Sequence, residues 1–290
     1  MHYRGVVALD LDGTIVHRGS IILRSDLLAI RAARDAGLLP VVATGRRVAT
    51  SRRFARDLGL ADCPLVACDG ALVLSPRRRQ PWLARPVPPR IVARVAELCR
   101  RHGVSVGFST LQGLFVQVGA NAMHPLRYLL RRGALRSPGR LRRALWDMTD
   151  RRVVEGRFEA GGELPVYKID LFGPGSAEAR AWLADELQGV RGTAPVGPLE
   201  VVAEGVDKAV AVEEILRRYG LDWSQVLAIG NDWNDRGMIE RAGFGVAMAD
   251  APRPVREVAR LVTGRVQEGG AGQAIESYLA LLPPQEDPRL

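Results

Sequence analysis

Short apolar runs alternate with helical segments at both ends of this sequence, and this alternation constrains the fold more than any other feature. Near the N-terminus the apolar runs are 6–9, 40–43 and 65–68, and near the C-terminus they are 226–229 and 244–247. Uninterrupted apolar runs of this length are typical of strands that are buried on both faces. Strand–helix–strand alternation predicts a parallel sheet that is covered by helices, so we expect an α/β core.

The middle of the sequence follows another pattern. A proline cluster interrupts the alternation at Pro76, Pro81, Pro86, Pro88 and Pro89. Such a cluster is typical of a domain boundary. Beyond it, strands are expected at 104–109, 114–118, 166–172 and 199–202. We therefore predict a core domain made of 1–79 and 204–290, with an α+β domain, 80–203, inserted between its two parts.

The net charge of +9 raises the question of a nucleic-acid partner. Of the 41 basic residues only Lys168 and Lys208 are lysines, and the arginines are scattered through every segment. The sequence has no zinc-finger spacing, aromatic RNA-binding motif or basic arm, so the charge alone does not favour nucleic-acid binding. In a chain that uses arginine almost everywhere else, the two lysines are candidates for work that arginine does not do.

The sequence also indicates in which cellular compartment the protein is expected. No apolar run approaches the roughly 18 residues that a membrane-spanning helix needs. Asp10 and Asp12 interrupt the region where a signal peptide would be apolar. The cysteines are odd in number and form no close pair, which favours neither a disulfide framework nor a zinc site. We expect a soluble cytoplasmic protein without a membrane partner.

The run Asp10-Leu11-Asp12-Gly13-Thr14 directly follows the first predicted strand. Ligand sites of open α/β sheets lie at the carboxyl ends of the strands. Carboxylates at positions i and i+2 lie on the same side of an extended chain, and a divalent cation relieves their mutual repulsion. A capping turn would also explain a single Asp-x-Asp. The residues that follow the other predicted strands are therefore needed to distinguish a capping turn from a cation-binding site.

Polar residues follow two further predicted strands. Thr44-Gly45-Arg46 comes after 40–43 and offers a hydroxyl group and backbone amides, which suit a phosphate oxygen. Gly230-Asn231-Asp232-Trp233-Asn234-Asp235 comes after 226–229 and concentrates oxygen ligands of the kind that Mg²⁺ prefers. Lys208 opens a predicted helix between them. Because several such signals occur at strand ends, we predict one site at this edge of the sheet.

Together these segments resemble the four motifs of the haloacid-dehalogenase superfamily: Asp10-x-Asp12-Gly13-Thr14, Thr44-Gly45-Arg46, Lys208 and Gly230-Asn231-Asp232-x-Asn234-Asp235. More narrowly, the sequence resembles the Cof-like phosphatases, which carry a large α/β cap between the second and third motifs. The resemblance covers nearly the whole chain and is weakest across 80–165. It implies a Rossmann-like parallel core with an inserted α+β cap.

The resemblance also implies roles for residues. Asp10 would be the nucleophile that forms an aspartyl-phosphate, and Asp12 would be the general acid and base. Thr44 and Lys208 would hold the phosphoryl oxygens, with Gly45 and Arg46 contributing to the phosphate and substrate site. The pair Asp69-Gly70, where family members often carry Asn-Gly, would lie nearby and belong to the same phosphate and substrate site.

A magnesium ion is the implied cofactor. Its expected ligands are Asp10, the backbone carbonyl of Asp12 and either Asn231 or Asp232. Asp235 would be a further ligand or would anchor the ligands from behind. The alternative between Asn231 and Asp232 arises because the family often begins its fourth motif with Gly-Asp, whereas this chain has Gly-Asn-Asp. From the sequence, both arrangements remain open.

The function that these residues favour is a Mg²⁺-dependent phosphatase of a small phosphorylated metabolite, such as a sugar phosphate or a phosphorylated cofactor. One alternative is a phosphomutase, which uses the same intermediate. The other is a non-enzymatic, basic nucleic-acid-binding module, although such a module has no need of these motif residues. Neither the particular substrate nor the oligomeric state follows from the sequence.

Overall fold

The computed structural model describes residues 3–18, 20–75, 80–120, 151–153, 164–172, 175–176, 178–184, 190–192 and 199–283. The chain divides into two compact units. Met1–Arg46, Thr50–Leu83 and Asp207–Leu290 form the first, which we call the core unit. Arg47–Ala49 and Ala84–Val206 form the second, which we call the insert unit.

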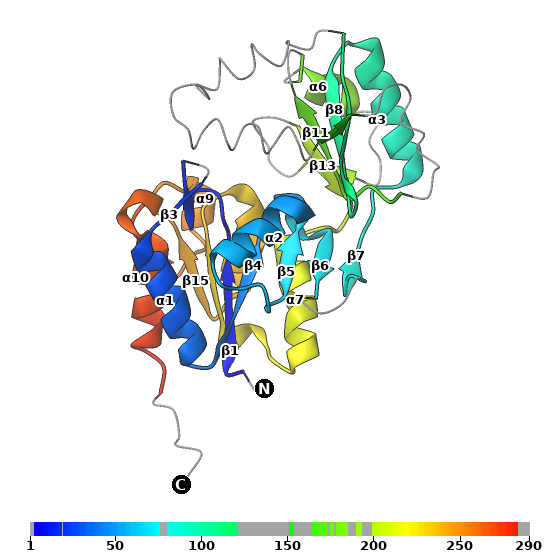
Figure 1. The fold of residues 1–290 in the computed structure, drawn as a ribbon. Coiled ribbons are helices and arrows are strands. Elements are labelled where there is room, and N and C mark those ends of the chain that lie inside the picture. Colours follow the sequence, from blue (N-terminus) through cyan, green and yellow to red (C-terminus); the bar gives the residue numbers. More distant parts are fainter. Residues whose placement is uncertain are drawn as a thin grey trace. The chain divides into compact units, whose positions relative to one another are not determined.

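The core unit is built on a mixed sheet that is mainly parallel (Figure 1). Its strands, in sheet order, are β16 (Leu261–Val262), β15 (Phe244–Ala247), β14 (Val226–Gly230), β1 (Gly5–Leu9), β4 (Leu38–Ala43), β5 (Leu65–Ala67), β6 (Leu72–Leu74) and β7 (Leu83–Ala84). The strands from β16 to β5 pair in parallel, and β6 turns back antiparallel to β5. The α/β class expected from the sequence is confirmed.

The central strand β1 joins the two ends of the chain. Val6 pairs with Val226 on one side, and Leu9 pairs with Val42 on the other. All five residues of β1 are buried. A strand that has helices on both of its faces has no polar face, and this explains its continuous apolar sequence. The carboxyl ends of β1, β4 and β14 consequently lie side by side.

Helices cover both faces of this sheet (Figure 1). On one face, α1 (Arg24–Asp35) packs against α10 (Gly270–Leu279), and the two helices contact β4 and β14 respectively. On the other face, α7 (Lys208–Tyr219) packs against α8 (Arg236–Arg241). The remaining helices of the core unit are α2 (Val48–Asp57) and α9 (Arg253–Arg256). Because α7 contacts the short turns Cys68–Gly70 and Trp233–Asp235, which follow β5 and β14, its first residues lie near the carboxyl edge of the sheet.

The insert unit contains a second sheet, which is mainly antiparallel. Its strands, in sheet order, are β10 (Arg151–Val153), β9 (Gly113–Gln117), β8 (Ser105–Thr110), β11 (Lys168–Phe172), β13 (Glu200–Ala203) and β12 (Val190–Gly192). The helices α3 (Pro89–Arg101) and α6 (Ala179–Ala184) accompany it. An apolar cluster joins both helices to the sheet and includes Val95, Phe108, Ile169 and Leu183. Alternate residues of β8 and β11 supply this core, as period-two patterning requires.

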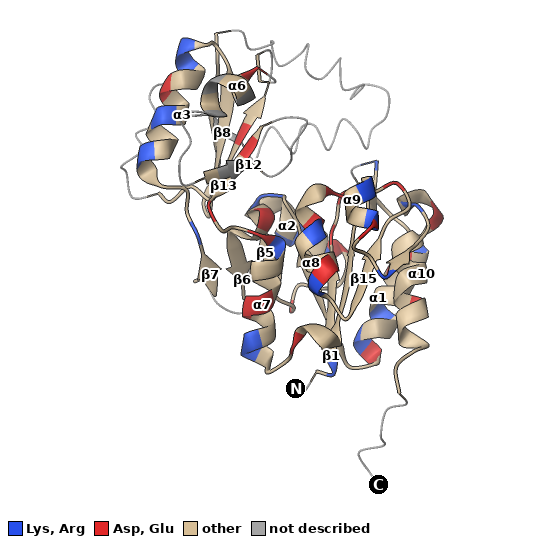
Figure 2. Ribbon diagram, turned by 180° about the vertical axis from the view of Figure 1, so that it is seen from behind, with Lys and Arg blue, Asp and Glu red and all other residues tan. Residues whose placement is uncertain are grey.

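Charges of both signs are interspersed along the described helices (Figure 2). On α3, Arg100 and Arg101 both pair with Glu97, and on α1, Arg31 pairs with Asp35. These three basic side chains thus have acidic neighbours one turn away. No described helix is both long and apolar enough to cross a membrane.

Candidate active site

Asp10 stands immediately after β1, where the chain leaves the sheet. Its backbone N–H donates to the carbonyl oxygen of Ile229 at 3.0 Å, which ties the start of this turn to β14. Gly13 then reverses the chain with φ of +83°, a conformation that side chains rarely tolerate. A Cβ atom at this position would also lie 2.3 Å from Nδ2 of Asn231. Glycine therefore allows the loop after β14 to approach the turn after β1.

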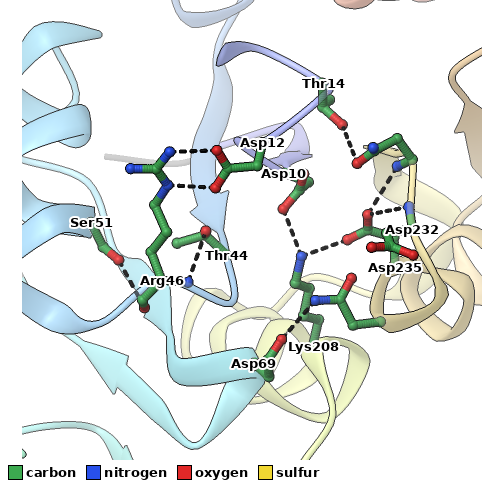
Figure 3. A network of polar contacts seen from close by, with 12 residues as sticks. Asp10, Asp12, Thr14, Thr44, Arg46, Ser51, Asp69, Lys208, Asp232 and Asp235 are labelled. Atoms are coloured by element: carbon green, nitrogen blue, oxygen red, sulfur yellow. Dashed lines mark hydrogen bonds and ion pairs between the residues drawn. The ribbon is translucent and has the colours of Figure 1, made fainter. Parts of the chain in front are cut away.

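Lys208, the first residue of α7, lies between two carboxylates (Figure 3). Its Nζ atom donates to Oδ1 of Asp10 at 2.7 Å and to Oδ1 of Asp235 at 2.6 Å. The Lys208 side chain is completely buried, and the Asp207 side chain caps the helix beneath it by accepting from the N–H of Ala209 at 2.7 Å. The helix start thus fixes the ammonium group at the end of β1, 198 residues from Asp10 in the sequence.

Burial and charge act against each other in this cluster. Burial raises the pKa of the Asp10 carboxyl, the negative charge of Asp235 raises it further, and Lys208 opposes both effects. For Lys208, burial disfavours the charged form, but the attraction of Asp10 and Asp235 outweighs burial and raises the pKa of the ammonium group. Lys208 is consequently a fixed positive charge that holds the Asp10 carboxylate in place.

Asp235 organises the loop after β14. Its Oδ2 atom accepts from the backbone N–H groups of Asn231 and Asp232 at 2.9 and 3.0 Å, while its other oxygen accepts from Lys208. The side chain is fully buried. Asp235 thus links the loop that carries Asn231 and Asp232 to the lysine beside Asp10.

The side-chain amide of Asn231 faces the turn after β1. One of the two terminal atoms of the amide lies 2.9 Å from the carbonyl oxygen of Asp12 and 3.3 Å from Oδ2 of Asp10. With the nitrogen turned toward them, the amide donates to both oxygens. With its oxygen turned toward them, it accepts from Oγ1 of Thr14 at 3.3 Å, and three oxygens face one another. Facing oxygens repel unless a cation lies among them, so this second orientation fits a bound metal ion.

Asp232 takes a different position from Asn231. It is exposed, and its Oδ1 atom accepts from the backbone N–H of Trp233 at 2.7 Å, where it caps a short turn. Within the described residues, no three His, Cys, Asp or Glu side chains gather into a metal-binding group. The oxygens that do converge come from one carboxylate, one backbone carbonyl and one amide, and of the two alternatives at the fourth motif it is Asn231 that faces them.

Thr44 and Arg46 follow β4 on the other side of β1. Thr44 is buried, and its Oγ1 atom accepts from the backbone N–H of Arg46 at 3.1 Å across Gly45. The guanidinium group of Arg46, which the sequence placed in the phosphate and substrate site, donates to both carboxylate oxygens of Asp12 (Figure 3). In this structure Arg46 is therefore a partner of the second carboxylate of the first motif.

Asp69 and Gly70 form the tight turn between β5 and β6. Gly70 has φ of +101°, and a Cβ atom there would lie 2.2 Å from the backbone oxygen of Asp207, next to Lys208. Asp69 also adopts a left-handed conformation, with φ of 58°, and is buried. Its Oδ1 atom accepts from Nδ2 of Asn234 at 2.6 Å. Asn234 was not among the predicted site residues, although its place in the oxygen-rich run after β14 could have indicated it.

Lys168, the other lysine, belongs to β11 of the insert unit. Its Nζ atom lies 2.7 Å from Oε2 of Glu200 and 3.7 Å from Oδ1 of Asp170. Six of the predicted core residues gather in two groups, which the contact of Asn231 with the Asp12 carbonyl links. One contains Asp10, Lys208, Asp235 and Asn231, and the other contains Asp12 and Arg46. Both groups lie at the carboxyl ends of adjacent parallel strands, where α/β sheets bind their ligands.

Comparison with known proteins identifies this arrangement. Residues 7–130 and 177–275 match the family of haloacid dehalogenase-like hydrolases. The chain is 24% identical over 279 residues to 5-amino-6-(5-phospho-D-ribitylamino)uracil phosphatase YitU of Bacillus subtilis, covering 95% of this chain and 98% of that protein. It is 25% identical over 277 residues to pyridoxal phosphate phosphatase YbhA of Escherichia coli, covering 94% of this chain and 98% of that protein.

A solved structure agrees in fold. A haloacid dehalogenase-like hydrolase from Bacteroides thetaiotaomicron superposes with a TM-score of 0.78 at 23% identity, covering 95% of this chain and 99% of the other. The chain belongs to the haloacid dehalogenase-like hydrolases. The resemblance to the Cof-like members of that superfamily and the predicted enzyme class, a phosphatase, are both confirmed.

Proposed function

We propose that this chain is a Mg²⁺-dependent phosphatase that hydrolyses a small phosphorylated metabolite through an aspartyl-phosphate on Asp10. The observation that carries the proposal is the setting of the Asp10 carboxylate. It is buried at the end of β1, with the ammonium group of Lys208 on one oxygen and the Asn231 amide facing the other. A fixed carboxylate beside a buried cation suits attack on an anionic phosphoryl group, because the cation offsets the repulsion.

In the first step, a carboxylate oxygen of Asp10 attacks phosphorus as the bond from phosphorus to the ester oxygen breaks. A protonated Asp12 gives its proton to the departing oxygen, which leaves as an alcohol. The products of this step are an aspartyl-phosphate and an ionised Asp12. Thr44, Gly45 and Lys208 hold the phosphoryl oxygens. The Asp69–Gly70 turn packs against the backbone of Asp207 and so supports Lys208.

In the second step, the Asp12 carboxylate takes a proton from water as the water oxygen attacks phosphorus. The bond between phosphorus and Asp10 breaks, which releases inorganic phosphate and regenerates the Asp10 carboxylate. Asp12 is protonated again, so the cycle closes. The two steps replace one difficult displacement with two easier ones.

The converging oxygens fit a magnesium ion. Octahedral Mg²⁺ holds oxygens at about 2.0–2.1 Å, which places neighbouring ligands about 2.9 Å apart. The end of the Asn231 amide lies 2.9 Å from the Asp12 carbonyl oxygen and 3.3 Å from Asp10 Oδ2. We assign the metal to Asp10, the Asp12 carbonyl and Asn231, with Asp235 anchoring the loop and Asp232 outside the site. When bound, the ion supplies positive charge that screens carboxylate from phosphate.

Two relatives support the substrate class. The names of YitU and YbhA specify a phosphorylated ribitylamino-uracil and pyridoxal phosphate, both of which are phosphorylated small molecules. For this chain we propose a sugar phosphate or a phosphorylated cofactor. We assign the choice among such substrates to the inserted domain, 80–203, because the core residues described above handle only the phosphoryl group and the leaving oxygen.

A screen of phosphorylated metabolites, with and without Mg²⁺, tests the proposal. The wild-type protein should release inorganic phosphate from at least one of them only when Mg²⁺ is present. Asp10→Asn removes the attacking charge and should lower the rate by at least about 10³-fold. Asp57→Asn, an exposed aspartate that pairs with Arg53 on α2, is the matched control.

Two results would contradict the proposal. Undiminished hydrolysis by folded Asp10→Asn would exclude this nucleophile. Transfer of the phosphoryl group to a second sugar hydroxyl, with no release of phosphate, would point to a phosphomutase.

A further inference from the structure

The pair formed by Arg46 and Asp12 has one largely buried and one half-exposed partner. Nε of Arg46 donates to Oδ2 of Asp12, and Nη2 donates to Oδ1, so the guanidinium group binds both carboxylate oxygens at once (Figure 3). The Arg46 side chain is only 14% exposed, whereas the Asp12 side chain is 53% exposed. A half-exposed carboxylate on a turn has several accessible rotamers, and the guanidinium group selects one of them.

Arg46 is held by contacts that do not involve Asp12. Its backbone N–H donates to Thr44 Oγ1 at 3.1 Å, and its backbone oxygen accepts from Ser51 Oγ at 3.1 Å and from the N–H of Cys68 at 2.9 Å. Its guanidinium group lies over the ring of Phe54, 4.4 Å from the centroid. Contacts within the core unit thus hold both the backbone and the guanidinium group of Arg46 independently of Asp12.

The geometry of this pair sets the direction in which Asp12 points. A guanidinium group binds a carboxyl group through two parallel bonds, which fix its orientation as well as its position. A protonated carboxyl group keeps acceptor capacity, so Arg46 can still hold Asp12 while the carboxyl group presents its proton. Without Arg46, the half-exposed side chain adopts rotamers that point away from the leaving group, and this misplacement slows proton transfer.

We propose that Arg46 is a positioning residue that orients Asp12 as the proton donor to the leaving group. This inference rests on the proposed function. In the step concerned, Asp10 bonds to phosphorus, the ester bond from phosphorus to oxygen breaks, and the proton moves from Asp12 to that oxygen. Asp12 ends the step ionised, with both oxygens accepting from Arg46.

The proposal predicts a dependence on the leaving group. An alkyl phosphate needs the proton because its leaving group would otherwise depart as a strongly basic alkoxide. A nitrophenyl phosphate needs it little, because nitrophenolate is a stable anion. The ratio kcat/KM covers only the steps up to release of the first product, so it isolates proton donation from the later attack of water.

The experiment compares p-nitrophenyl phosphate with the best alkyl phosphate of the metabolite screen. For Arg46→Ala, kcat/KM should fall about 10²-fold with the alkyl phosphate, the lower end of what general acid catalysis contributes, and only slightly with p-nitrophenyl phosphate. Arg46→Lys keeps the charge but loses the paired bonds, so it should lie between Arg46→Ala and wild type. Arg53→Ala is the matched control, because Arg53 approaches the same Phe54 ring, at 6.0 Å, and pairs with Asp57. It should behave like wild type with both substrates.

A double-mutant cycle supplies the second readout. In an Asp12→Ala background, Arg46→Ala should cause no further loss with the alkyl phosphate, because the group through which it acts is gone. Equal losses with both substrates, or additive losses in the cycle, would overturn the proposal. Activity with p-nitrophenyl phosphate also shows that each variant is folded. If the wild-type protein hydrolyses neither substrate, or Asp10→Asn stays active, the proposed function itself fails, and this inference fails with it.

Discussion

The core unit and the insert unit each bury one of the two lysines of the chain, and each lysine lies near two carboxylates. Lys208 contacts Asp10 and Asp235 at 2.7 and 2.6 Å, and its side chain is completely buried. Lys168 contacts Glu200 at 2.7 Å, but Asp170 is 3.7 Å away, and the Glu200 side chain is 38% exposed. Similar residue types therefore produce two different electrostatic settings.

The difference lies in how the carboxylates are held. Around Lys208 they come from the ends of two parallel strands and cannot turn toward water. Lys168, Asp170 and Glu200 come from β11 and its neighbour β13, and Asp170 pairs directly with Glu200 across the two strands. Like charges directly opposite one another in a sheet are unfavourable, and Lys168 offsets that repulsion. We infer that the core lysine serves the reaction and that the insert lysine serves the sheet or the choice of substrate.

Replacing each lysine in turn should give the largest difference in phosphatase rate between the two units. Lys208→Met leaves two buried carboxylates without their cation and should lower kcat/KM for p-nitrophenyl phosphate by at least about 10²-fold, as loss of an electrostatic stabiliser does. Lys168→Met should leave that rate nearly unchanged. Thermal unfolding of both variants separates lost chemistry from lost fold. If Lys168→Met were the more damaging of the two to p-nitrophenyl phosphate hydrolysis, the comparison of the two lysines would be wrong.

Substitutions at the proposed metal site, which also lies in the core unit, should have a smaller effect, and this effect is on the affinity for Mg²⁺. Asn231→Asp adds an anionic oxygen facing Asp10 and the Asp12 carbonyl, so it should lower the Mg²⁺ concentration for half-maximal activity by about tenfold, since hard cations prefer anionic oxygen. Asp232→Asn should hardly change it, because that side chain caps a turn. The rise in Tm on adding Mg²⁺ is a second readout that needs no turnover. A greater loss of Mg²⁺ affinity from Asp232→Asn than from Asn231→Ala would place the metal on Asp232 instead.

The smallest expected effect concerns a buried core carboxylate that has no lysine. Asp26 on α1 is fully buried, and its Oδ1 atom accepts from the N–H of Gly272 at 2.8 Å. Its Oδ2 atom has no hydrogen-bond partner within the described residues. Burial raises the pKa of Asp26 from 3.8 to about 6, against the opposing hydrogen bond from Gly272. This group shows what burial does to a carboxylate when no cation compensates.

The contribution of Asp26 to the stability of the fold depends on pH, and its sign follows from proton binding. Between about pH 4 and pH 6 the folded chain keeps the Asp26 proton that the unfolded chain has lost, so the contribution of this group to stability falls as pH rises. Asp26→Asn should remove that fall and raise Tm at neutral pH by a few degrees. The control is Asp35→Asn, an exposed residue of the same helix. Tm measured from pH 4 to pH 7 checks this, and an unchanged slope in Asp26→Asn would contradict it.

The fold and the grouping of the core residues followed from the sequence for one physical reason. Parallel strands bring their carboxyl ends to one edge, so polar residues placed directly after apolar runs must meet there. Asp10 and Lys208 lie 198 residues apart and still form a hydrogen bond. Thus the alternation of strands and helices was sufficient to predict that the motif residues of the core unit converge.

The partners of individual side chains did not follow from the sequence. The sequence placed Arg46 in the phosphate and substrate site but did not indicate that its side chain lies over Phe54 and pairs with Asp12. The hydrogen bond between Asp69 and Asn234 joins two loops, and the left-handed conformation of Asp69 depends on that turn. Such contacts depend on rotamers and loop geometry, which residue spacing alone does not encode.

The most direct test of the central claim is to trap the covalent intermediate. The protein is mixed with a substrate from the screen in the presence of Mg²⁺, quenched in acid during turnover, digested and analysed by mass spectrometry. The account predicts one phosphoryl group on the peptide that contains Asp10, and none on that peptide in Asp10→Asn. A phosphoryl group on another residue, or rapid turnover with an unmodified Asp10 peptide in every quench, would contradict the assignment of Asp10 as the nucleophile.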